Sequence, residues 1–275
     1  MLEIWDAERF EEEKSGGRTR PLVIECSRMQ TESEVGNSEK NNTPPPNLQR
    51  LMLVKTANQH IDSRGLFSEV YGNLFAREFG VTTPFPAIIR LGEDFVAALK
   101  LGAASRHLNL SPGLAVGCEY LRGLAPVIPS SFRNNEESAD LKAIYGVDLL
   151  LQNPDRRPEK PNCAMYRGGI LAFDFELAFS FLLPLIGPQP AAWAVDEQSI
   201  AARHLFFAEL KQIRAELDWT RFIQVLKSFR TERMAALFGT VPSEWRSYAD
   251  KVANPLSVVC DHAPQFNDAL IRSLL

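Results

Sequence analysis

Short apolar runs bounded by turn residues fill the N-terminal part of the chain, and this pattern predicts strands. One helix is expected among them, because apolar side chains recur at helical spacing from Leu66 to Phe79 and Gly80 follows as a C-terminal cap. This part of the chain is therefore expected to form a small antiparallel sheet that carries a single helix. The expected strands cover residues 21–26, 51–55, 87–91 and 95–99.

From residue 140 onward the apolar positions take the helical period. The clearest stripe steps by four, three and four residues through Phe206, Leu210, Ile213 and Leu217. Such stripes are typical of helices that turn one face toward a core. The C-terminal part of the chain is therefore expected to be mainly helical.

The change of pattern divides the chain into two expected lobes. Residues 1–117 form the strand-rich lobe and residues 118–275 the helical lobe, with a hinge near residues 117–123. Within the first lobe, residues 27–47 are polar and contain three consecutive prolines, so this segment is expected to be a long exposed loop. The expected fold class is α+β.

Composition excludes several classes of protein. With 275 residues, 45% of them hydrophobic and 23% charged, the chain has the make-up of a globular protein with a sizeable core. A formal net charge of −4 argues against binding to bulk nucleic acid. The widely spaced cysteines predict neither disulfides nor a zinc site, and no segment resembles a membrane span or a signal peptide. A cytoplasmic protein is expected.

A polar loop followed by two short apolar runs carries the candidate chemistry. The loop contains Asp155 and Asn162, a Gly-Gly turn separates the two runs, and Asp174 ends the second run. A hairpin of this kind brings the three side chains to one edge. Phosphoryl transfer needs such a set, since one carboxylate orients the incoming hydroxyl while an amide oxygen and a second carboxylate hold Mg²⁺. The alternative is an ordinary surface turn, in which Asp174 caps a helix.

These residues resemble those of the HipA-like kinases, relatives of the eukaryotic protein kinase and phosphatidylinositol kinase folds. Asp155 followed by Asn162 is similar to the catalytic loop of the family, and Asp174 stands where its magnesium-binding aspartate belongs. The resemblance covers almost the whole chain. It implies a bilobal protein kinase-like fold, ATP and Mg²⁺ as cofactors, Asp155 as a catalytic residue, and Asn162 and Asp174 as metal ligands.

The resemblance also implies a nucleotide site. Lys55 ends a predicted strand and is similar to the lysine that neutralises phosphate oxygens, so a catalytic and nucleotide-binding role is expected for it. Glu69 on the single helix is expected to pair with Lys55. The other expected nucleotide contacts come from a phosphate-covering loop and from the hinge, at Gly16, Gly17, Glu119 and Tyr120.

Two positions depart from the family pattern, Lys160 in the loop and Glu176, which stands where the related eukaryotic motif has a glycine. Lys160 stands five residues after Asp155, where related loops often carry an asparagine, and Asn162 follows two residues later. One register gives the metal-binding role to Asn162, while the other puts Lys160 at the ligand position and leaves metal binding in doubt. Asn153 has two readings as well, support of the loop or weak metal binding.

Three functions remain open at this stage. The first is an active kinase that phosphorylates a serine or threonine hydroxyl of a protein. Because the family includes toxin–antitoxin kinases, the resemblance also implies an antitoxin or regulatory protein as a partner. The second is a kinase fold that binds partners as a scaffold without catalysis. The third is a small-molecule kinase.

Overall fold

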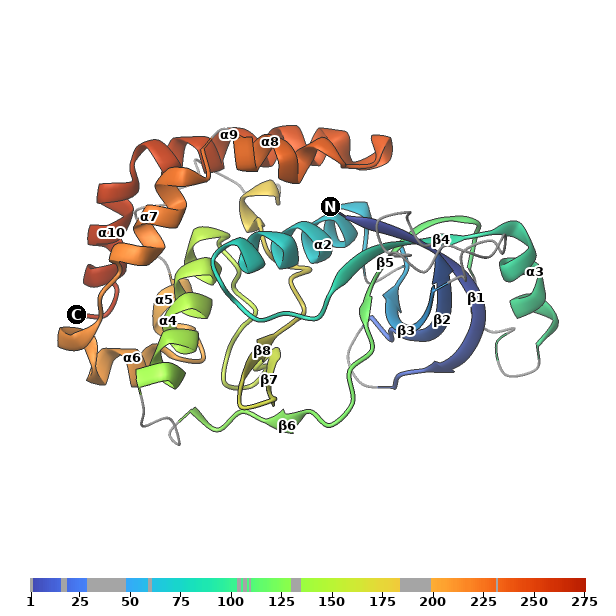
Figure 1. Ribbon diagram of the computed structural model, residues 1–275, viewed down its shortest axis with the longest axis horizontal. Helices are drawn as coiled ribbons and strands as arrows, with labels where there is room; N and C mark the ends of the chain where they lie inside the picture. Colours follow the sequence, from blue (N-terminus) through green and yellow to red (C-terminus); the bar gives the residue numbers. More distant parts are fainter. Residues whose placement is uncertain are drawn as a thin grey trace, which may run out of the picture. The chain divides into compact units, whose positions relative to one another are not determined.

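The computed structural model describes residues 2–15, 19–28, 48–58, 61–102, 105, 108, 110–129, 135–183, 199–230 and 232–275. Packing separates the chain into two compact units. The sheet unit consists of Leu2–Asp62 and Phe85–Leu121, and the helical unit consists mainly of Ser63–Pro84 and Arg122–Leu275. Strands and helices are both plentiful, so the chain is an α+β protein (Figure 1).

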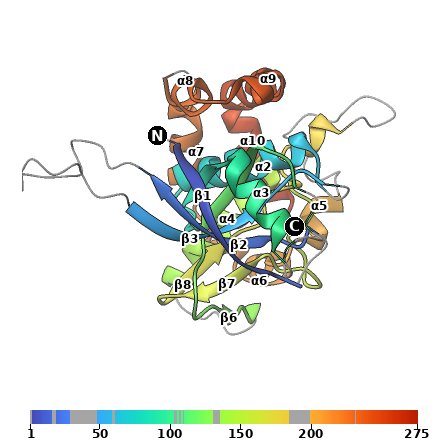
Figure 2. The same cartoon turned by 90° about the vertical axis from the view of Figure 1, so that its right-hand side faces the viewer.

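Five strands of the sheet unit close into a barrel in the order β1-β2-β3-β5-β4. Figure 2 shows β1, β2 and β3 as neighbours. Four of the five strand pairs are antiparallel, but β1 and β4 pair in parallel, which corrects the prediction of a purely antiparallel sheet. The strands are β1 (Glu3–Glu13), β2 (Leu22–Arg28), β3 (Leu48–Lys55), β4 (Pro86–Leu91) and β5 (Gly113–Glu119).

The core of the sheet unit lies inside this barrel. Trp5 has no exposed surface, and the guanidinium of Arg28 lies 5.2 Å from its ring centre. At Gly117 an added Cβ would lie 2.8 Å from a side-chain carbon of Ile89, so β5 approaches β4 more closely than a larger residue would allow. Closure of the sheet leaves its strands without a free edge. The buried members of this core include Ile24, Met52, Val54, Ala87 and Ala115.

The strand predicted at residues 95–99 is wrong, because α3 (Glu93–Leu101) occupies this position. The two acidic residues Glu93 and Asp94 stand in its first turn and Lys100 in its last, an arrangement that favours a helix electrostatically. The apolar face of α3 packs against the barrel core. The expectation of a single helix among the strands therefore failed as well.

The helical unit combines helices with a small three-stranded sheet in the order β6-β7-β8. Among the described residues, no helix has the length and apolarity that crossing a membrane requires. The strands are β6 (Ala125–Pro126), β7 (Cys163–Tyr166) and β8 (Gly169–Ala172). The helices are α2 (Ser63–Glu78), α4 (Asn135–Leu150), α5 (Ser199–Arg203), α6 (Phe207–Gln212), α7 (Thr220–Ser228), α8 (Glu232–Gly239), α9 (Arg246–Asp261) and α10 (Ala263–Arg272).

Helix α2 confirms the helix predicted from Leu66 to Phe79, but its partners lie in the helical unit. The ring of Phe75 meets that of Phe229 at 4.5 Å between centres, and Tyr71 meets Phe238 at 5.7 Å. Contacts of this kind place Ser63–Pro84 with the helices rather than with the strands that flank it in sequence. The packing units therefore differ from a division of the chain between residues 117 and 118.

Candidate active site

The hairpin predicted after the polar loop is confirmed, but its turn is Arg167-Gly168 rather than the expected Gly-Gly pair, because Gly169 already belongs to β8. Strands β7 and β8 pair antiparallel, with Tyr166 opposite Gly169. The two residues between them, Arg167 and Gly168, have φ values of 51° and 85°, as a tight two-residue hairpin turn requires. Strand β8 is anchored further, since the Ala172 N–H donates a hydrogen bond of 2.9 Å to the Thr82 carbonyl. The hairpin thus fixes where the chain leaves β8 toward Asp174.

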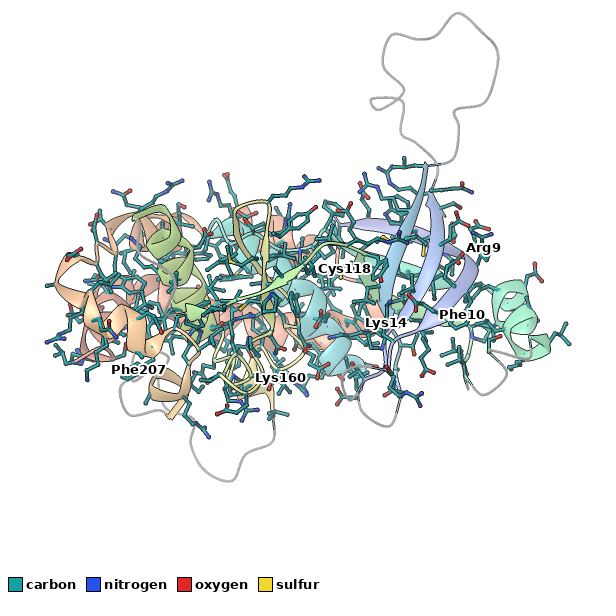
Figure 3. All side chains as sticks on the ribbon, turned by 90° about the horizontal axis from the view of Figure 1, so that it is seen from below. Arg9, Phe10, Lys14, Cys118, Lys160 and Phe207 are labelled. Atoms are coloured by element: carbon teal, nitrogen blue, oxygen red, sulfur yellow. The ribbon has the colours of Figure 1, made fainter. Side chains whose placement is uncertain are left out.

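The Lys160 ammonium lies between the carboxylates of Asp155 and Asp174, and Asn162 contacts Asp155. Lys160 Nζ donates to Asp155 Oδ2 at 2.5 Å and lies 3.2 Å from Asp174 Oδ2. The Asn162 amide donates to the carbonyl oxygen of Asp155 and to its Oδ2, each at 3.2 Å. Asn162 and Asp174 both have left-handed backbone, with φ values of 48° and 62°. The structure therefore joins the two predicted carboxylates through a lysine. Lys160 is labelled in Figure 3.

Exposure differs among these charged groups. The side chain of Asp155 is 5% exposed and that of Asp174 19%, while Lys160 is 41% exposed. A second cation approaches Asp155, because Arg157 Nη2 lies 3.4 Å from Oδ1. Partial burial lowers the pKa of Lys160, but the hydrogen bond to Asp155 and the charge of Asp174 outweigh it and raise the pKa above 10.5. Lys160 therefore carries its charge at neutral pH.

A buried ion pair supports the loop from beneath. Asp148 near the end of α4 accepts a 2.5 Å hydrogen bond from Arg156 Nε, and neither side chain has any exposed surface. Asp148 also accepts from Asn153 Nδ2 at 2.8 Å and from His204 Nε2 at 3.0 Å. The Asp155 N–H donates to Asn153 Oδ1 at 3.3 Å. Of the two readings of Asn153, support of the loop is therefore the one that these bonds favour.

Arg156 also connects the loop to the end of the hairpin. Its Nη1 donates to the carbonyl oxygens of Asn162 and Phe173, the residues that directly precede β7 and Asp174. Its guanidinium carbon lies 5.2 Å from the centre of the Phe175 ring. At Gly72 of α2, an added Cβ would come within 2.8 Å of Phe175 Cβ, so α2 closes tightly over this segment. Arg156 thus holds both chain segments that carry the predicted site.

Sequence reasoning missed the Asp148–Arg156–His204 network. A signal existed, because Asp148 interrupts the apolar run from Tyr145 to Leu151 and a carboxylate in such a run needs a partner. The sequence could not identify His204 as a partner of Asp148, because 56 residues separate the two along the chain. Only the folded chain brings the two together.

The network favours an anionic Asp148 and a neutral His204. Although burial raises the pKa of Asp148, the Arg156 guanidinium and the His204 hydrogen bond lower it more. Burial lowers the pKa of His204 despite the neighbouring carboxylate. Because His204 Nδ1 accepts the Phe206 N–H at 3.1 Å, the ring proton stands on Nε2, which donates to Asp148.

Mild acid is expected to destabilise the fold through His204. Its pKa is lowered from 6.5, so below about pH 6.5 the unfolded chain binds a proton that the folded protein excludes, and the free energy of unfolding falls. Asp148 adds its own loss only below about pH 3.8, because the Arg156 guanidinium and the His204 hydrogen bond lower its pKa in the folded protein. Urea denaturation between about pH 7.5 and pH 5 measures the slope. His204→Gln should flatten it, and an unchanged slope in His204→Gln would contradict this account.

The predicted nucleotide residues lie elsewhere in the chain. Lys55 is the buried last residue of β3, and Glu119 ends β5 with its N–H donating to the Phe85 carbonyl at 3.0 Å. The Tyr120 N–H donates to the Leu51 carbonyl at 2.9 Å. Glu69 lies on α2, in the other packing unit, and its pairing with Lys55 stays a prediction. Gly16 and Gly17 lie outside the described residues.

The predicted magnesium ligands do not fit a divalent ion in this arrangement. Lys160 places an ammonium against both carboxylates, and Asn162 turns its NH₂ group, a donor, toward Asp155. Mg²⁺ needs oxygen atoms at these positions. Across the described part of the chain, no group of three or more His, Cys, Asp or Glu residues forms a metal site. The cation between Asp155 and Asp174 is the lysine.

Comparisons with known proteins add little to this geometry. No family model matches the chain, and no curated protein matches it. Among solved structures, the proinflammatory kinase CtkA of Helicobacter pylori is similar over 98% of this chain and 97% of its own, with 13% sequence identity and a TM-score of 0.45. A likeness of this degree assigns neither a fold nor a function to the chain.

Proposed function

We propose that the chain is an ATP- and magnesium-dependent phosphotransferase of the HipA-like type, which phosphorylates a serine or threonine hydroxyl of a protein. One observation carries the proposal: Asp155 from the loop and Asp174 from the end of the hairpin both contact a single cation, at 2.5 and 3.2 Å. Phosphoryl transfer requires a proton acceptor and a negatively charged group that holds a cation beside the phosphate. Two carboxylates that contact one cation can supply both.

Asp155 is the proposed catalytic base. It is held by Asn162 and by the loop beneath it, so its carboxylate needs little reorganisation. In the proposed step the acceptor hydroxyl oxygen forms a bond to the γ-phosphorus of ATP, the bond from that phosphorus to the β-phosphate oxygen breaks, and the hydroxyl proton passes to Asp155. Precise positioning of this kind supplies most of the catalysis in phosphoryl transfer.

The sheet unit is the proposed nucleotide-binding part. Lys55 and Glu119 belong to adjacent strands, since β3 pairs with β5 and Met52 lies opposite Glu119. The buried Lys55 is proposed to neutralise phosphate oxygens, with Glu69 as its partner, while Glu119 and Tyr120 are proposed to meet adenine. The bilobal kinase-like arrangement, with lobes at residues 1–117 and 118–275, belongs to the same proposal.

Magnesium enters the proposal through Asp174 and Asn162. When bound, the ion would neutralise the charge on the transferred phosphate. The ammonium of Lys160 lies 3.2 Å from Asp174 Oδ2, so a divalent ion can bind this oxygen only after the lysine side chain moves away.

Incubation of the full chain with ATP, Mg²⁺ and a mixture of protein acceptors tests the function. Label from [γ-³²P]ATP should appear on serine or threonine of a protein, and label from [α-³²P]ATP should not. Transfer to small molecules alone would support the small-molecule kinase instead. Absence of any transfer of γ-label would contradict the proposed activity.

A scaffold function is the second candidate. The convergence of the two carboxylates supports transfer chemistry, but the group between them is the ammonium of Lys160, and a permanent ammonium there favours a protein without catalysis. ATP should raise the midpoint of thermal unfolding if the chain binds nucleotide, because a ligand stabilises the state that binds it. A scaffold without a nucleotide site would show no shift. The antitoxin partner and the cytoplasmic location stay predictions.

A further inference from the structure

We propose that Lys160 is a tethered cation that stands in for a divalent ion between Asp155 and Asp174, and that it sets how tightly this site binds such an ion. The inference concerns the site of the proposed function, and it rests on that function only for the role that a divalent ion would have there. Its test needs neither nucleotide nor acceptor, so its outcome is independent of whether the chain transfers phosphate.

The contacts of Lys160 carry the inference. Its Nζ lies 2.5 Å from Asp155 Oδ2 and 3.2 Å from Asp174 Oδ2, so one ammonium serves an oxygen of each carboxylate. Asp174 Oδ2 is an oxygen that the proposed divalent ion would need, and Asp155 Oδ2 faces the same position from the other side. Lys160 and a metal ion therefore cannot occupy this position together.

The backbone holds Lys160 where it makes these contacts. Arg157 and Lys160 exchange two backbone hydrogen bonds, N–H to carbonyl, of 3.1 and 3.0 Å. The two residues between them are Pro158 and Glu159, and proline favours the second position of such a turn. A tight four-residue turn thus fixes the root of the Lys160 side chain, although the side chain as a whole is 41% exposed.

The charges of the site are already balanced. The carboxylates of Asp155 and Asp174 face the ammonium of Lys160 and the guanidinium of Arg157, whose Nη2 lies 3.4 Å from Asp155 Oδ1. A divalent ion that entered beside both cations would be repelled, and one that replaced Lys160 would break two ion pairs. Loss of the ammonium should therefore strengthen divalent-ion binding.

Titration of the full chain with Mn²⁺ alone, followed by electron paramagnetic resonance of the free ion, tests the proposal. Mn²⁺ accepts the same oxygen ligands as Mg²⁺ and is observed directly. Lys160→Met keeps the unbranched stem and removes the charge, and its Kd for Mn²⁺ should fall on the order of tenfold below that of wild type. Lys160→Arg retains a cation and should bind Mn²⁺ as weakly as wild type.

Two controls link any gain to this site. Lys142→Met removes a lysine that contacts the Asp218 carbonyl instead, and it should leave the Kd unchanged. Adding Asp174→Asn to Lys160→Met should abolish the gain. Lys160→Gln serves as a second neutral variant if Lys160→Met does not unfold as cooperatively as wild type.

A Kd that changes less than about threefold in the neutral variants, including no detectable binding by any of them, would overturn the proposal. A gain that survives Asp174→Asn would overturn it too, since the ion would then bind elsewhere. A clear gain in a chain that transfers no phosphate would uphold the role of Lys160 while the proposed function failed.

Discussion

Replacing Arg156 with methionine is expected to lower the free energy of unfolding by about 3–5 kcal/mol. The change removes the guanidinium that pairs with Asp148, and both side chains are fully buried in the helical unit. The Asp148 carboxylate would then stay buried with only the Asn153 amide and the neutral His204 as donors. An uncompensated buried charge costs far more than the net contribution of the intact pair.

Urea denaturation monitored by circular dichroism measures this loss. Arg230→Met is the matched control, because Arg230 pairs with Asp261 at 2.8 Å while its side chain is 58% exposed. Exposed pairs contribute about 0–1 kcal/mol, so the control should change little. The double variant Asp148→Asn with Arg156→Met should be more stable than Arg156→Met alone, since it removes the unpaired charge. Equal losses in Arg156→Met and Arg230→Met would show that the buried pair has no special role.

Replacing Asp155 with asparagine is expected to reduce phosphoryl transfer by about 10²–10⁴-fold, the range in which a positioned acid or base contributes. The amide keeps the shape of the carboxylate but cannot take the proton of the acceptor. Asp174→Asn should be at least as damaging, because neutralisation and positioning of the phosphate charge provide most of the catalysis proposed here.

Initial rates of transfer from [γ-³²P]ATP measure both effects, with thermal unfolding as the check on folding. Asp268→Asn, an exposed position on α10, provides the matched control and should transfer phosphate at the wild-type rate. Transfer by Asp155→Asn at the wild-type rate would remove Asp155 from the mechanism. Loss of activity in Asp268→Asn as well would point to a fault in folding or preparation.

Local patterns predicted the elements whose formation depends on nearby residues. The hairpin at β7 and β8 follows from two apolar runs around a Gly-Gly turn, and α2 follows from its helical spacing and the glycine that ends it. The same loop and hairpin identified Asp155, Asn162 and Asp174, which the fold brings together. Their chemical roles stay predictions.

Other elements escaped prediction for physical reasons. Strand β1 is rich in charge, and register shifts at Ala7/Arg9 and Phe10/Glu12 break the alternation that identifies a strand. In α3 the short apolar run at residues 95–99 fits a strand as well as a helix. The acidic residues of the first turn favour the helix, because they interact with its dipole. A local pattern holds no information on the parallel pairing of β1 with β4, which joins Glu3 to Ala87.

The sequence by itself determined that two carboxylates and an asparagine lie on one loop and hairpin, since hairpin geometry depends on adjacent residues. It left two registers for the metal-binding position, one at Asn162 and one at Lys160. Only the tertiary structure showed an ammonium against both carboxylates, with the buried Asp148–Arg156–His204 network beneath them. Such contacts join residues far apart in the chain, and burial makes their charges interact strongly, so no local periodicity records them.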